Sequence, residues 1–123
     1  MEAQLIVCNK VNFDKSHSIE KVLNHVNVEV FPWIVNVEVF IKLSEISSIE
    51  TTDLALLVID DEKNILNNSP TFAVRNYRDS DQIPGVDLDM KVQLILLKSG
   101  NITFELYLNQ EKVATYPLIV RIV

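Results

Sequence analysis

Apolar and polar residues alternate over several long stretches of the chain. Every odd-numbered residue from 33 to 43 is apolar, whereas the residues between them include asparagine, glutamate and lysine. Such strict alternation is typical of an antiparallel strand that has one face in the core. The same pattern recurs over residues 26–30, 86–96, 102–108 and 116–122. The alternating stretches therefore predict half-buried strands of one or two antiparallel sheets.

Two other runs are apolar at consecutive positions. Residues 5–8 and 54–59 have this pattern, which predicts strands that are covered on both faces. The chain has only two glycines, so we expect asparagine and aspartate, which tolerate left-handed backbone, to form most turns. The segment Ser99-Gly100-Asn101 predicts the tightest hairpin, and residues 12–18 predict another turn. Residues 44–50 have helical spacing for one turn at most.

The elements together predict the fold class. About eight strands, with no helix long enough to connect parallel strands, favour an all-β, two-sheet antiparallel β-sandwich over any α/β architecture. An immunoglobulin-like arrangement is expected, with a jelly roll as the alternative. The length of 123 residues fits a single domain that spans residues 1–123.

Charge and hydropathy exclude several classes of partner. The chain carries 17 acidic and 11 basic residues, which gives a net charge of −6. The lysines and arginines are scattered, so no basic patch favours binding to nucleic acid or to an anionic membrane surface. No apolar run is long enough to span a membrane, and the first residues lack the pattern of a signal peptide. We therefore expect a cytoplasmic protein.

Few residues suggest catalysis. Cys8 stands in an apolar run, which predicts a buried strand residue rather than a reactive thiolate. His17 and His25 form no His-x-His pair, and no nucleophile elbow, phosphate-binding loop or zinc pattern is present. The sequence therefore predicts a protein that is not an enzyme and needs no cofactor.

Acidic residues gather in two predicted loops. Asp60 and Asp61 occupy one turn, and Asp79 and Asp81 lie in the loop 77–85. Calcium prefers several oxygen ligands that converge from loops at one end of a sandwich, so these four are candidate calcium ligands. A solvated acidic surface explains the same pattern better, because the aspartates lack the spacing of a dedicated calcium loop.

Tyr77 and Tyr107 are the aromatic residues that the pattern places outside the core. Tyr77 falls in a loop, and Tyr107 lies with Glu105 on the polar face of its strand. Trp33 has the parity of the core residues, so we expect it to be buried. The outer face that contains Glu105 and Tyr107 is partly apolar, which favours an interface with a partner.

Five features follow one another along the chain: the apolar strand 3–8, Phe31-Pro32 before the long alternating strand, the turn 60–63, the segment 99–109, and Pro117 in the last strand. Their order resembles that of a family of small bacterial β-sandwich proteins that is described only as a domain of unknown function. The resemblance implies the sandwich fold and no site residue. Two departures occur: Asp61-Glu62 replaces an expected Asp-Gly turn, and residues 44–53 are longer and more polar.

These observations lead to one functional prediction and one alternative. The prediction is a non-enzymatic protein-interaction module that uses a sheet face or an edge strand to bind another protein or a second copy of itself. Tyr77, Glu105 and Tyr107 are its candidate contact residues. The alternative is a ligand-binding sandwich that takes calcium in the acidic loops or a carbohydrate on the two tyrosines.

Overall fold

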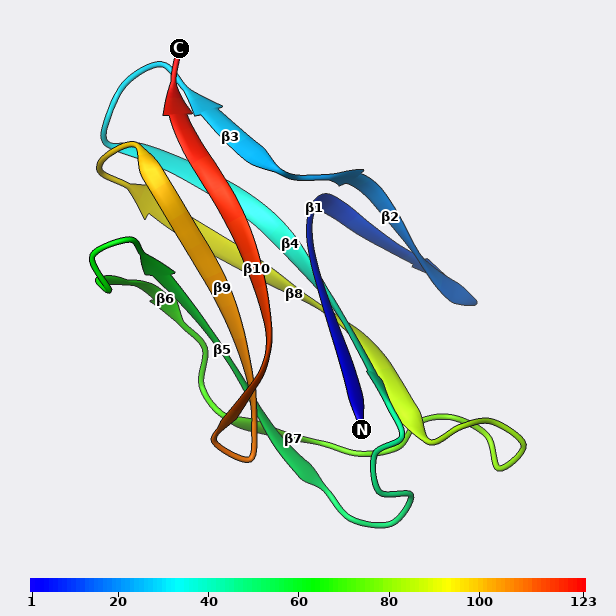
Figure 1. Ribbon diagram of the computed structural model, residues 1–123. Helices are drawn as coiled ribbons and strands as arrows, with labels where there is room; N and C mark the ends of the chain where they lie inside the picture. The colour runs from blue at the N-terminus through cyan, green and yellow to red at the C-terminus, as the bar shows by residue number, and fades with distance from the viewer.

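The computed structural model describes all 123 residues, and it contains ten strands and no helix (Figure 1). Helix-free folding agrees with the abundance of β-branched residues in the alternating stretches. No segment forms a helix long and apolar enough to cross a membrane. The strands are β1 (Glu2–Asp14), β2 (Ser16–Val22), β3 (His25–Val28), β4 (Trp33–Ser44), β5 (Thr52–Asp60), β6 (Ile65–Asn68), β7 (Phe72–Val74), β8 (Gly85–Leu96), β9 (Gly100–Leu108) and β10 (Glu111–Ile122).

The strands form two sheets that pack face to face. The four-stranded sheet has the order β2-β1-β4-β8, and the six-stranded sheet has the order β3-β10-β9-β5-β6, with β7 also paired to β5. Neighbouring strands are antiparallel except for β3 and β10, which are parallel. The predicted all-β, two-sheet sandwich is therefore confirmed. The structure has two strands more than the expected eight, because short segments, such as the three residues of β7, form strands of their own.

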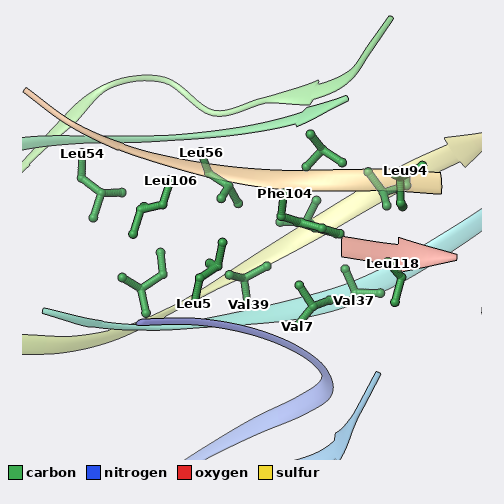
Figure 2. Close-up of a cluster of buried hydrophobic side chains, with 14 of the residues drawn as sticks. Leu5, Val7, Val37, Val39, Leu54, Leu56, Leu94, Phe104, Leu106 and Leu118 are labelled. Carbon is green, nitrogen blue, oxygen red and sulfur yellow. The ribbon is translucent and has the colours of Figure 1, made fainter. Parts of the chain in front are cut away.

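The core lies between the two sheets and consists of the alternating apolar residues. Figure 2 shows side chains of β1 and β4 facing side chains of β5, β9 and β10 across this space. The predicted parity is confirmed along β4 from Val37 to Leu43. The predicted burial of Trp33 is wrong, since this residue is 39% exposed. Trp33 is the first residue of β4 and lies at the end of the sheet, opposite Leu96. The fully buried centre includes Val7, Val39, Leu54, Leu94, Phe104 and Leu106.

The hairpin of β1 and β2 bends out of the sandwich and covers the face of the four-stranded sheet that points away from the main core. Residues of β1 up to Cys8 pair with β4, whereas those from Cys8 to Asp14 pair with β2. Residues 9–22 are termed the flap below. Figure 2 shows β1 turning away from the core side chains where the flap begins. Beneath the flap, a small second core forms from Cys8, Val11 and Phe40, with Ile6 and Ile19 packed against it.

Cys8 and Phe40 lie on the outer face of the four-stranded sheet, and both are buried because the flap covers them. Cys8 is fully buried there, as the sequence predicts, and its Sγ donates a hydrogen bond to the carbonyl of Glu38 at 3.4 Å. Burial, with a smaller effect of the Glu38 charge, raises the pKa of the Cys8 thiol. The thiol therefore stays protonated at neutral pH, which removes Cys8 as a nucleophile.

Several predicted turns differ in the structure. Strands β1 and β2 continue through residues 12–18, so Lys15, with φ of 62°, forms the turn almost alone. Ser99-Gly100-Asn101 forms no hairpin, because β8 and β9 belong to different sheets. Residues 44–50 contain no helical turn; instead the Ser47 hydroxyl accepts hydrogen bonds from two backbone amides. The turn between β9 and β10 uses no glycine, as expected, since Asn109 and Gln110 both have positive φ.

Candidate functional site

Two hollows in the surface contain residues that the sequence singled out. The end pocket, about 340 Å³, lies between the β5–β6 turn and the β8–β9 connection. The flap groove, about 480 Å³, lies between the tip of the flap, the β7–β8 loop and the start of β8. Residues 60–62, 64–66 and 96–102 line the end pocket, and residues 13, 15–17, 77–78 and 86–88 line the flap groove.

The acidic groups of the end pocket already have partners within the chain. The Asp60 carboxylate accepts hydrogen bonds from the amides of Glu62 and Asn64 at 2.8 Å each and from the Asn64 side chain at 3.0 Å. The Asn64 side-chain bond contributes most to lowering the pKa of Asp60. Lys98 Nζ contacts Glu62 and lies 3.1 Å from Asp61 Oδ1, and these bonds raise the pKa of Lys98. The charged groups of the pocket are therefore bound to one another, although the side chains of Asp61 and Glu62 remain 46% and 71% exposed.

The four aspartates proposed for calcium do not converge. Asp79 and Asp81 lie in the loop before β8, whereas Asp61 contacts Lys98, which follows the other end of β8 (Figure 1). β8 has 12 residues, and at about 3.3 Å per residue its ends are roughly 36 Å apart. No group of three or more His, Cys, Asp and Glu side chains is arranged to hold a metal ion. The structure therefore brings Asp60 and Asp61 together in one turn but places Asp79 and Asp81 at the other end of β8.

Glu105 and Tyr107 lie together on the outer face of the six-stranded sheet. Glu105 is only 7% exposed and accepts hydrogen bonds from Tyr107 Oη at 3.0 Å and from Lys112 Nζ at 3.2 Å. Desolvation, with the bond to Glu105, raises the pKa of Tyr107. These polar groups satisfy one another. Tyr77 lies beside the other sheet, in the flap groove, so the two tyrosines form no shared platform for a carbohydrate.

The flap groove brings together two exposed aromatic rings from distant parts of the chain. Phe13, near the tip of the flap, is 69% exposed, and Tyr77, in the β7–β8 loop, is 66% exposed. The guanidinium of Arg75 lies over the Tyr77 ring, 5.3 Å from its centroid. The Tyr77 amide donates to the Gly85 carbonyl at 2.9 Å, which fixes the start of the loop against β8. Two apolar surfaces are thereby held at one groove.

His17 holds the tip of the flap against the sheet. Its ring centroid lies 4.9 Å from that of Phe13 and 5.3 Å from that of Phe40, with both pairs tilted. His17 Nε2 also lies 3.7 Å from Asp89 Oδ1 on β8. Phe40 is part of the second core, so these contacts link the exposed ring of Phe13 to a buried support. The sequence placed His17 in a turn and missed this role.

Asp87 is the acidic residue in the flap groove, and two cations neutralise it. Its Oδ1 lies 3.0 Å from Arg78 Nη2 and 3.2 Å from Lys42 Nζ. Burial raises the pKa of the Asp87 carboxyl, but the hydrogen bonds from Arg78 and Lys42 outweigh it and lower the pKa below the ordinary value. Arg78 Nη1 also donates to the Ile83 carbonyl at 3.1 Å. The ion cluster thus ties the β7–β8 loop to the sheet.

Replacing Asp87 by asparagine is expected to lower the stability at neutral pH. The pKa of Asp87 is lower in the folded state than in the unfolded state. The stability that its carboxylate contributes is therefore fully present above the unfolded-state pKa, and it disappears as the pH falls through the folded-state pKa. We expect a loss on the order of 1 kcal/mol at pH 7, since partly exposed pairs contribute little each. Urea unfolding of both proteins between pH 7 and pH 2 checks this. A difference that grows towards low pH would contradict it.

Comparisons with known proteins identify no family for this chain. No family model matches the chain, and no curated protein matches it. The resemblance to the bacterial sandwich family therefore stays a prediction. Among solved structures, the chain is similar to the Pseudomonas fluorescens alkylpurine DNA glycosylase AlkC bound to DNA containing an abasic site analog, with a TM-score of 0.43 and 6% identity. The match covers 95% of this chain and 30% of the glycosylase chain, and a likeness at this level carries no argument about activity.

The functional prediction from the sequence needs correction. A non-enzymatic protein-interaction module was expected, but no comparison points to an interaction module. The expected interface also differs, because Glu105 is buried and is hydrogen-bonded to Tyr107 rather than open to a partner. The prediction is therefore wrong and is not retained.

Proposed function

We propose that the chain is a binding protein without catalytic activity, which takes a small, planar aromatic ligand in the flap groove. The observation that carries this proposal is the pair of exposed rings, Phe13 and Tyr77, which line one groove from separate segments of the chain. Large apolar side chains that gather in a concave site are a common feature of small-molecule sites. Stacking on such rings stabilises a flat ligand by about 1–3 kcal/mol per ring.

The support beneath the rings favours binding. Phe13 packs on His17, which packs on the buried Phe40, and Tyr77 carries the Arg75 guanidinium on its ring. Side chains held in this way lose less conformational entropy when a ligand arrives. A groove that is formed before binding therefore supports a binding role.

The polar residues of the groove favour binding without turnover. Ser16 and His17 both line it, but they are consecutive on β2, and side chains of consecutive strand residues leave opposite faces. A hydroxyl nucleophile needs a base within hydrogen-bond reach, which this arrangement disfavours.

As for location, the single cysteine is a free thiol, which supports a reducing compartment such as the cytoplasm.

An NMR titration with indole tests the proposal. We expect saturable shifts of the amides of residues 13–17, 77–78 and 86–88, because indole is flat, aromatic and uncharged. Phe13→Ala and Tyr77→Ala should each weaken binding roughly tenfold, since each removes one stacking ring. Ile65→Ala is the matched control, because Ile65 is 64% exposed but lies in the end pocket.

Two results would contradict this function. One is a set of shifts confined to residues 60–66 and 96–102, which would move the site to the end pocket. The other is no saturable shift up to the solubility limit of indole.

A further inference from the structure

The flap groove has two cations beside it that have no acidic partner. Lys15 forms the turn of the flap and lines the groove, and Arg75 lies on the Tyr77 ring. Neither takes part in any of the ion pairs of the chain. Among the residues that line the groove, Lys15 and Arg78 are cations and Asp87 is the one carboxylate. The lining therefore carries one net positive charge in a protein whose net charge is −6.

The two acidic groups that contact residues of the groove already have partners other than Lys15 and Arg75. Asp87 in the groove is bound by both Lys42 and Arg78, and Asp89 lies beside His17. Arg78 is itself engaged by Asp87, so it adds no free charge. A ligand that binds Lys15 and Arg75 consequently has no ion pair of the chain to break.

The placement of Arg75 suits recognition of an anion. Its guanidinium lies over the ring of Tyr77, which is the arrangement of a cation–π contact. A guanidinium stacked on its flat face keeps its N–H groups at the edge of the plane, where they match a carboxylate or a phosphate. An aromatic ligand on the rings would carry its charged group towards these donors.

We propose that the ligand of the flap groove is a planar aromatic anion, whose ring stacks on Phe13 and Tyr77 and whose carboxylate or phosphate binds Lys15 and Arg75. This proposal rests on the proposed function, because it names the class of ligand that the same groove takes. Adding an anionic group to a flat ligand should therefore raise its affinity. The gain should shrink as salt is added, since screening weakens exposed charge pairs.

Calorimetry with paired ligands tests the charge separately from the ring. Indole-3-acetate is compared with indole, and adenosine monophosphate with adenosine, at low and at high salt; acetate and inorganic phosphate serve as the anion alone. We expect at least one anionic member to bind roughly tenfold more tightly than its uncharged partner, which corresponds to about 1.4 kcal/mol. A gain in the indole pair identifies a carboxylate ligand, and a gain in the adenosine pair identifies a phosphate.

Matched lysine variants locate the effect. Lys15→Gln should abolish much of the gain, whereas Lys63→Gln should leave it intact, because Lys63 has a similar φ of 68° but lies in the β5–β6 turn. Arg75→Gln should also reduce the gain, and circular dichroism confirms that each variant is folded.

The outcomes separate the two proposals. If indole binds in the groove and neither anion binds more tightly than its neutral partner, the anion proposal is overturned and the aromatic site stands. A gain that persists in both Lys15→Gln and Arg75→Gln also overturns it. If none of the flat ligands binds, the proposed function itself fails.

Discussion

Replacing Phe104 by alanine is expected to lower the free energy of unfolding by about 3–5 kcal/mol, the usual cost of removing a buried phenylalanine ring. Phe104 is fully buried and lies on β9, between Val58 of β5 and Tyr116 of β10 (Figure 2). Its ring fills the space between the sheets, so alanine leaves a cavity that strands paired on both sides cannot close. Urea unfolding followed by circular dichroism measures the change.

Phe13→Ala is the matched control for this variant. It removes the same ring from a site that is 69% exposed, so we expect a change of about 0.5 kcal/mol or less. A loss below about 1 kcal/mol for Phe104→Ala would mean that the core is not centred on β9. Equal losses in the two variants would have the same meaning.

Replacing Gly85 by alanine is expected to destabilise the protein by about 1–3 kcal/mol or more, as overpacking does. Gly85 is the first residue of β8 and pairs with Ser44 at the end of β4. A Cβ atom at this position would lie 2.2 Å from the Leu43 carbonyl oxygen and 2.6 Å from Arg78 Nη1. The carbonyl belongs to the backbone of the core strand and cannot turn aside, so the start of β8 must shift.

Thermal unfolding and an NMR amide spectrum measure this effect. Besides a lower melting temperature, we expect shifts near Arg78 and Asp87, because their ion pair adjoins Gly85. Ser80→Ala in the same loop is the control, since Ser80 is exposed and makes no such contact. A Gly85→Ala protein as stable as the control would show that β4 and β8 are not paired in this register.

The sequence predicted the strands well because their pattern is local. In β4 and β9, one face of each strand is buried, so alternation determines which residues reach the core. The partners of each strand depend on residues far away in the chain, and local pattern contains no such information. For this reason the good turn residues of Ser99-Gly100-Asn101 predict a hairpin, although the segment joins two different sheets.

The flap groove was less accessible to sequence reasoning. Phe40 is apolar at a polar position, which signals a covered outer face, but alternation does not identify the segment that covers it. Phe13 lay in a predicted turn, and an aromatic residue in a turn was the one available sign of an exposed ring. Phe13 and Tyr77 line one groove only because β1 bends at Cys8.

The central claim is that an aromatic anion binds between the flap and the β7–β8 loop, and intermolecular nuclear Overhauser effects test it most directly. The measurement uses the full chain with bound indole-3-acetate. The account predicts contacts from the indole ring protons to the ring protons of both Phe13 and Tyr77. Contacts confined to the methyl groups of Ile65 and Leu97, which line the end pocket, would contradict it.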